Sequence, residues 1–161
     1  LFKINDLDLD NLDVNTLNEY YFKTMHHEFT HILNQRKPYD TNYDRITESS
    51  YVGSDWYQIY DDQALQMGFI SPYAMDRGSE DFAEMLSIFV TNSADTWESY
   101  LEAAEPDPNS PYYNPDVNGR AILEQKFDIV YKYMKDSWGV DLYELRDVVQ
   151  RRQGEINTLF N

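Results

Sequence analysis

The sequence predicts a mainly helical domain, or at most an α+β fold with little sheet. Apolar residues recur at helical spacing in several segments, most clearly at 79–91 and 120–137. Only residues 1–5 alternate apolar and polar side chains in the manner of a short edge strand. The chain has 161 residues, 42% of them hydrophobic, which is enough to bury the core of one domain. We therefore expect a single domain over residues 1–161.

The charge of the chain restricts its partners. A formal net charge of -16 indicates a surface that repels nucleic-acid phosphates and anionic membranes, so we expect no nucleic-acid partner. No apolar run approaches the roughly 18 residues that a membrane-spanning helix needs. The chain has no cysteine, which excludes a disulfide framework and any cysteine metal site.

The start of the chain suggests a missing part. It begins at Leu1 without an initiator methionine or a signal peptide, and the histidine motif described below lies unusually near this start. We therefore expect the chain to be a C-terminal fragment of a longer protein.

The first predicted helix runs from about Thr16 to Gln35 and stops before Pro38. Its apolar residues recur at helical spacing and are expected to face the core: Phe22, Met25, Phe29 and Ile32 or Leu33. An aspartate-rich stretch precedes it, comprising Asp6, Asp8, Asp10 and Asp13. It starts like a calcium-binding loop, but Asn11 and Leu17 stand where that loop needs glycine and glutamate. We interpret it as a turn and helix cap.

The rest of the chain alternates predicted helices with loops. Helices are expected at 55–67, ended by Gly68, and at 79–91, 94–105 and 120–137. A last helix starts at Asp141, which with Glu144 resembles a capping box, and Gly154 is expected to close it. Loops are expected at 39–55, 69–78 and 105–119, and the last of these holds four of the six prolines. The expected buried residues are Phe82, Met85, Leu86 and Phe89, then Leu123, Phe127, Val130 and Met134, then Leu142, Leu145 and Val148.

The first helix carries the pattern His-Glu-x-x-His, formed by His27, Glu28 and His31. Residues four apart share one face of a helix, so the two histidines can bind one metal ion and Glu28 can reach the water on it. This is the ligand spacing of a zinc hydrolase with Glu28 as general base. The remaining histidine, His26, lies one residue off that face, and we interpret it as a surface or supporting residue.

The third ligand of the expected single zinc ion must be a carboxylate. A catalytic zinc ion takes three protein ligands and a water, and the chain has no histidine after His31 and no cysteine. Glu80 and Glu84 lie four apart on a predicted helix and point the same way. We assign Glu80 to the metal and Glu84 to the free ring N–H of a ligand histidine. Glu48 is the alternative ligand.

The two motifs together resemble those of the gluzincins, metallopeptidases with two histidines and a glutamate on zinc. The run Glu-Asp-Phe-Ala-Glu at 80–84 resembles the glutamate helix of the lethal-factor-type peptidases. Those enzymes carry a tyrosine seven residues ahead of the zinc-binding glutamate, a position that Tyr73 occupies here. The resemblance implies a zincin-like catalytic domain, in which Tyr73 donates to the developing oxyanion or to the leaving amine.

A narrower resemblance covers nearly the whole chain. The chain is similar to zinc metallohydrolase lipoproteins found with TonB-dependent import systems of Bacteroidetes. The segments that carry this likeness are residues 1–5, the motif helix, 68–74, the Glu80 helix, 139–142 and 145–146. The resemblance implies an extracytoplasmic protein, either an outer-membrane lipoprotein or one secreted to the periplasm or cell surface, with a TonB-dependent system as a partner.

The sequence thus predicts a zinc metallopeptidase of the gluzincin type that hydrolyses amide bonds of a peptide or protein substrate. Two alternatives remain open. One is a weakly catalytic or non-catalytic, metal-containing accessory that binds substrate for an outer-membrane import system. The other is a zinc hydrolase that acts on a glycopeptide or a non-peptide amide.

Overall fold

The computed structural model describes residues 13–159, and within them the chain is helical without a strand. The helices are α1 (Val14–Leu17), α2 (Lys23–Arg36), α3 (Asn42–Ile46), α4 (Asp61–Gln66), α5 (Gly78–Thr91), α6 (Ala94–Ala103), α7 (Gly119–Trp138) and α8 (Leu142–Leu159). A π-helical segment, η1 (Asn18–Phe22), joins α1 to α2, and three short 3₁₀ turns follow, η2 (Glu48–Ser50), η3 (Gly53–Gln58) and η4 (Tyr73–Met75). The predicted mainly helical fold is confirmed. The strand expected at 1–5 and the aspartates at 6–10 lie outside the described residues.

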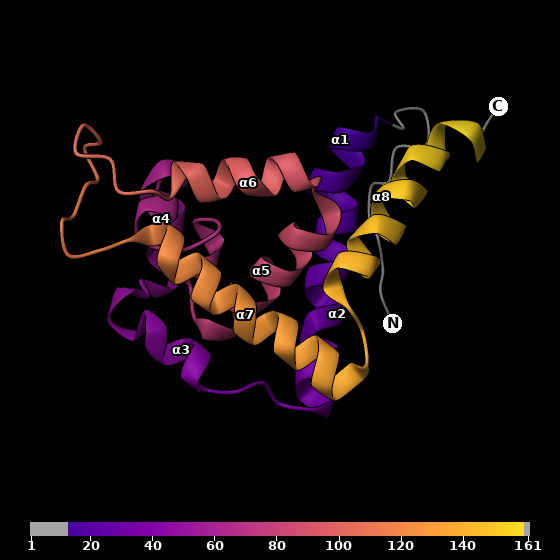
Figure 1. Ribbon diagram of the computed structural model, residues 1–161, viewed down its shortest axis with the longest axis horizontal. Coiled ribbons are helices and arrows are strands. Elements are labelled where there is room, and N and C mark those ends of the chain that lie inside the picture. The colour runs from indigo at the N-terminus through magenta and orange to yellow at the C-terminus, as the bar shows by residue number, and fades with distance from the viewer. Residues whose placement is uncertain (1–12, 160–161) are drawn as a thin grey trace.

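Helix α5 is the centre of the fold. In Figure 1 it passes through the middle of the molecule, and α7 crosses in front of it. Helices α2, α7 and α8 and the turn η4 all pack against it. Every residue from Asp81 to Thr91 is buried, so α5 has no solvent-facing side beyond its first turn. The polar groups that it carries must therefore find partners inside the protein.

The first long helix buries a different face from the one predicted. The buried residues of α2 are His27, Thr30 and Leu33. The predicted stripe is wrong in its main members, because Met25, Phe29 and Ile32 are exposed by 40%, 50% and 42%. The spacing identifies the apolar face of the helix correctly, but the prediction assumed that this face is buried. Here α2 turns its polar face to α5, whose carboxylates are the partners of His27.

Several predicted boundaries also change. The expected loop at 39–55 contains α3, which buries Tyr43 completely. The helix expected at 55–67 is divided into η3 and α4. Helix α8 continues through Gly154 to Leu159, since a glycine costs a helix only about 1 kcal/mol. Val148 on the same helix is 44% exposed and does not join the core.

The remaining helices lie within about two residues of their predicted bounds. Gly68 and Gly139 take positive φ angles of 80° and 67° at the ends predicted for them. The Asp141 carboxylate accepts hydrogen bonds from the backbone N–H groups of Tyr143 and Glu144, as the capping pattern predicts. No helix within 13–159 is long and apolar enough to cross a bilayer.

One fully buried ion pair fixes α5 against α7. The Nζ of Lys126 lies 2.6 Å from Oδ2 of Asp81, and both side chains are 0% exposed. Lys126 also donates to the Gly68 carbonyl at 2.9 Å, and its ammonium lies 3.8 Å from the centre of the Phe69 ring. The hydroxyls of Tyr43 and Tyr51 donate to the two carboxylate oxygens of Asp81. Burial raises the pKa of Asp81, and the charge of Lys126 opposes that rise.

This pair makes a prediction about stability. Substituting Lys126→Met should lower the free energy of unfolding by roughly 3–5 kcal/mol, because it leaves the Asp81 carboxylate charged and unpaired in the core. Urea unfolding followed by circular dichroism measures the loss.

Two further variants serve as controls for the stability loss of Lys126→Met. Adding Asp81→Asn to Lys126→Met should recover part of the loss, since no charge then remains buried. Lys132→Met breaks an ion pair on the exposed side of the same helix and should cost about 1 kcal/mol or less. Equal stability of Lys126→Met and Lys132→Met would contradict the role given to the buried pair.

Candidate metal centre

Three side chains predicted as zinc ligands converge on one point. The Nε2 atoms of His27 and His31 are 3.1 Å apart. Oε2 of Glu80 lies 3.0 Å from Nε2 of His27 and 3.2 Å from Nε2 of His31. Within the described part of the chain, these three form the group of histidine and acidic residues that could hold a metal ion. Glu48 and His26 are not members of it.

The helices place these groups directly. His27 and His31 lie one turn apart on the face of α2 that packs against α5. Glu80 lies in the first turn of α5, where the helix begins at Gly78. The Cβ of any other residue at Gly78 would lie 2.0 Å from a carboxylate oxygen of Asp44, so a larger residue there would have to displace the Asp44 side chain.

Glu84, one turn after Glu80 on α5, contacts the other ring nitrogen of His27. Oε1 of Glu84 lies 2.9 Å from Nδ1 of His27. Oε2 accepts hydrogen bonds from Ser71 Oγ at 2.7 Å and from Lys23 Nζ at 3.2 Å. Glu84 is only 1% exposed. Burial alone would raise its pKa, but the hydrogen bond from His27, the charge of Lys23 and the hydrogen bond from Ser71 together lower it. A charged Glu84 keeps the proton of His27 on Nδ1 and leaves Nε2 free to bind a metal.

The residues present fit a zinc ion. The three donor atoms form a nearly equilateral triangle with sides of 3.0–3.2 Å. One face of a zinc tetrahedron with bonds of about 2.0–2.1 Å has edges of about 3.3–3.4 Å. Burial would lower the pKa of His27, but Glu84 and Glu80 raise it, so the electrostatic field at the ring favours a cation. Two histidines and a carboxylate with a fourth position open is a donor set typical of catalytic zinc.

The remaining predicted residues lie beside this triangle. Glu28 is exposed and, with His31 and Glu80, lines an open cleft of about 470 Å³. The ring of Tyr73 lies 5.7 Å from that of His27. Burial and the contact with Glu80 raise the pKa of Tyr73 to about 12, so its phenol stays protonated near neutral pH.

Sequence reasoning missed the other two partners of Glu84. Lys23 lies four residues before His27 and therefore on the same helical face, a spacing that could have indicated it. Ser71 lies in the loop that leads to Tyr73, and nothing local links it to a residue 13 positions later. Both residues act on the centre through Glu84 rather than by touching the three donor atoms.

The sequence and fold of the chain are similar to those of known proteins. Residues 1–143 match the protein family described as "Putative zinc-binding metallo-peptidase". A crystal structure of a putative zinc-binding metallo-peptidase from Bacteroides caccae shares 41% sequence identity with this chain, and the two superimpose with a TM-score of 0.81. The match covers 98% of this chain and 56% of that one, so this chain spans little more than half of its relative. No curated protein matches the sequence.

The geometry predicts unequal losses of zinc from two variants on α5. Glu80→Gln should weaken zinc binding most, because it replaces a charged atom of the donor triangle. Glu84→Gln should weaken it by about 10–100-fold, since it removes only the charge that supports His27. Competition with a chromophoric chelator measures both affinities, and Glu48→Gln, on an exposed carboxylate outside the cluster, serves as the control. A larger loss from Glu84→Gln than from Glu80→Gln would exchange the two roles.

Proposed function

The chain belongs to this family of putative zinc-binding metallo-peptidases, and on that premise we propose that it hydrolyses peptide bonds as a gluzincin-type enzyme. In this proposal His27, His31 and Glu80 hold one zinc ion, and Glu28 is the general base. The observation that carries it is the triangle of donor atoms at 3.0–3.2 Å, with the Glu28 carboxylate exposed in the cleft beside it.

Each residue has a defined part in the proposed reaction. Zinc bound at this site would polarise the scissile carbonyl and lower the pKa of a bound water toward ~7, from about 15.7 in bulk. Glu28 takes a proton from the attacking water and passes it to the leaving nitrogen, so that the C–O bond forms and the C–N bond breaks. The protonated hydroxyl of Tyr73 donates a hydrogen bond to the oxyanion of the tetrahedral intermediate. Glu84 keeps the His27 ring in one orientation throughout.

The proposal extends to the setting of the protein. The resemblance of the sequence to import-associated lipoproteins supports this part of the proposal. We therefore propose an extracytoplasmic location and a TonB-dependent import system as partner. Fractionation of the native cells with an antibody to this chain tests the location, and recovery in the cytoplasm would contradict it.

Glu28→Gln tests the general base. The variant should lose at least about 10²-fold in turnover, because the amide cannot accept the proton of the attacking water. It should keep its zinc, since Glu28 is outside the donor triangle. The assay is mass spectrometry of a broad peptide digest incubated with the zinc-loaded protein, with and without chelator.

Three outcomes of that assay have distinct meanings. Undiminished cleavage by Glu28→Gln would eliminate Glu28 as the base. Cleavage that persists in chelator would eliminate the metal mechanism. A zinc-loaded wild-type chain that cleaves no peptide would instead favour the binding accessory or a hydrolase of non-peptide amides.

Tyr73→Phe tests the oxyanion donor. Removing the hydroxyl should lower kcat by about 10²–10³-fold while KM changes little, because the hydrogen bond forms only as charge develops on the oxygen. Zinc content should stay near that of the wild type. Tyr57→Phe, at a tyrosine that is 69% exposed, is the matched control and should leave kcat unchanged. A kcat for Tyr73→Phe equal to that of Tyr57→Phe would remove Tyr73 from the mechanism.

A further inference from the structure

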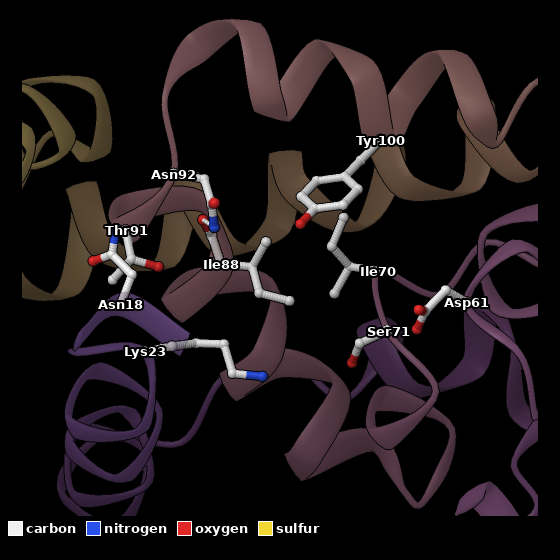
Figure 2. A pocket seen from close by; sticks show the side chains of 9 residues that line it. All are labelled: Asn18, Lys23, Asp61, Ile70, Ser71, Ile88, Thr91, Asn92 and Tyr100. Atoms are coloured by element: carbon white, nitrogen blue, oxygen red, sulfur yellow. Dashed lines mark hydrogen bonds between the residues drawn. The ribbon is translucent and has the colours of Figure 1, made fainter. Parts of the chain in front are cut away.

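A second cavity lies behind the metal centre. It has a volume of about 420 Å³, and Figure 2 shows the side chains around it. Its walls come from η1, the start of α2, the end of α5, α4, α6 and the loop before η4. None of His27, His31 and Glu80 is among its lining residues, which are Asn18, Lys23, Asp61, Ile70, Ser71, Ile88, Thr91, Asn92 and Tyr100.

Opposite charges face each other across this cavity. In Figure 2 the ammonium of Lys23 and the carboxylate of Asp61 lie on opposite sides and point inward, with the Ser71 hydroxyl between them. The side chains of Ile70 and Ile88 form an apolar patch in the middle. The cavity therefore offers a cationic end, an anionic end and an apolar surface within one volume.

Several of these polar groups have unused hydrogen-bonding capacity. Within residues 13–159, the carboxylate of Asp61, an exposed residue, and the hydroxyl of the half-buried Tyr100 make no hydrogen bond or ion pair to another side chain or to the backbone. Lys23 makes one hydrogen bond, to Glu84, and an ammonium can donate three. Burial and the charges of Asp61 and Glu84 raise the pKa of Tyr100, so its hydroxyl remains a donor. Free donors and acceptors that converge on a partly apolar cavity are typical of a small-molecule site.

We infer that this cavity binds a small zwitterion that carries a free ammonium and a free carboxylate, as a free amino acid or a short peptide does. The ligand carboxylate pairs with Lys23, and its ammonium pairs with Asp61. Tyr100 and Ser71 bind polar atoms between the two ends, and Ile70 and Ile88 contact an apolar side chain. The inference stands apart from the proposed hydrolysis, because no residue of the donor triangle lines the cavity.

Isothermal titration calorimetry of the zinc-loaded full chain tests this inference. L-Leucine and the dipeptide Ala-Leu are the probes, and at least one of them should bind. Which of the two binds more tightly identifies a free amino acid or a peptide as the source of the zwitterion. N-acetyl-leucine lacks the ammonium and leucinamide lacks the carboxylate, and each should bind about tenfold more weakly than leucine if leucine is the ligand. For the dipeptide, N-acetyl-Ala-Leu and Ala-leucinamide are the corresponding derivatives.

Matched variants locate the binding. Asp61→Asn and Tyr100→Phe should each weaken binding, the first by about tenfold or more. Asp62→Asn, at the next residue of α4 and outside the cavity, should leave the affinity unchanged. Lys23→Gln should weaken binding too, and its zinc content is measured in parallel because Lys23 also contacts Glu84.

The inference is overturned by any of three results. The first is the absence of binding heat for both zwitterions at millimolar concentration. The second is equal affinity in Asp61→Asn and Asp62→Asn, which would place the ligand elsewhere, including the metal centre. Binding of N-acetyl-leucine as tight as that of leucine would likewise exclude a role for the ammonium and with it the proposed ligand class.

Discussion

The structure depends on one constraint, which is that α5 is buried along almost its whole length while it carries three carboxylates. Each carboxylate needs a partner inside the protein, because an unpaired buried charge is far too costly. Asp81 takes Lys126 and two tyrosine hydroxyls, Glu84 takes His27, Lys23 and Ser71, and Glu80 faces both histidines of the triangle. The neighbours of α5 are therefore arranged by what its acidic groups require, and the metal centre is one part of that arrangement.

The orientation of α2 follows from this constraint. A helix with apolar residues at positions 25, 29 and 32 would ordinarily turn them inward. Turning them inward here would leave Glu84 without His27 and Lys23, since those residues lie on the opposite face. The observed orientation satisfies the buried carboxylate and leaves Met25, Phe29 and Ile32 largely exposed. Leaving apolar side chains exposed forgoes about 25 cal/mol for each Å² that would otherwise be buried. An unpaired buried charge costs several kcal/mol by itself. The orientation that gives Glu84 its partners is therefore the favoured one.

Whether an interaction could be predicted from the sequence depends on how far apart its two residues lie along the chain. The spacing of His27, Glu28 and His31, and that of Glu80 and Glu84, are properties of single helices and could be read directly. The pairing of the two helices followed from elimination, because the chain offers no further histidine or cysteine. Ser71 against Glu84 and Lys126 against Asp81 could not be predicted, since these pairs are 13 and 45 residues apart and no local pattern relates them. The prediction of the buried face of α2 was wrong for the same reason. Which face of α2 is buried depends on α5, against which it packs, and not on the sequence of α2 alone.

Glu84 connects the two sites of the molecule. One of its oxygens contacts His27 in the donor triangle, and the other accepts from Lys23 and Ser71, which line the cavity behind it. In the inferred complex, the Lys23 ammonium would be shared between the ligand carboxylate and Glu84, the same side chain that contacts Nδ1 of His27. Binding free energies are reciprocal, so any effect of the cavity ligand on zinc affinity would equal the effect of zinc on the affinity for that ligand.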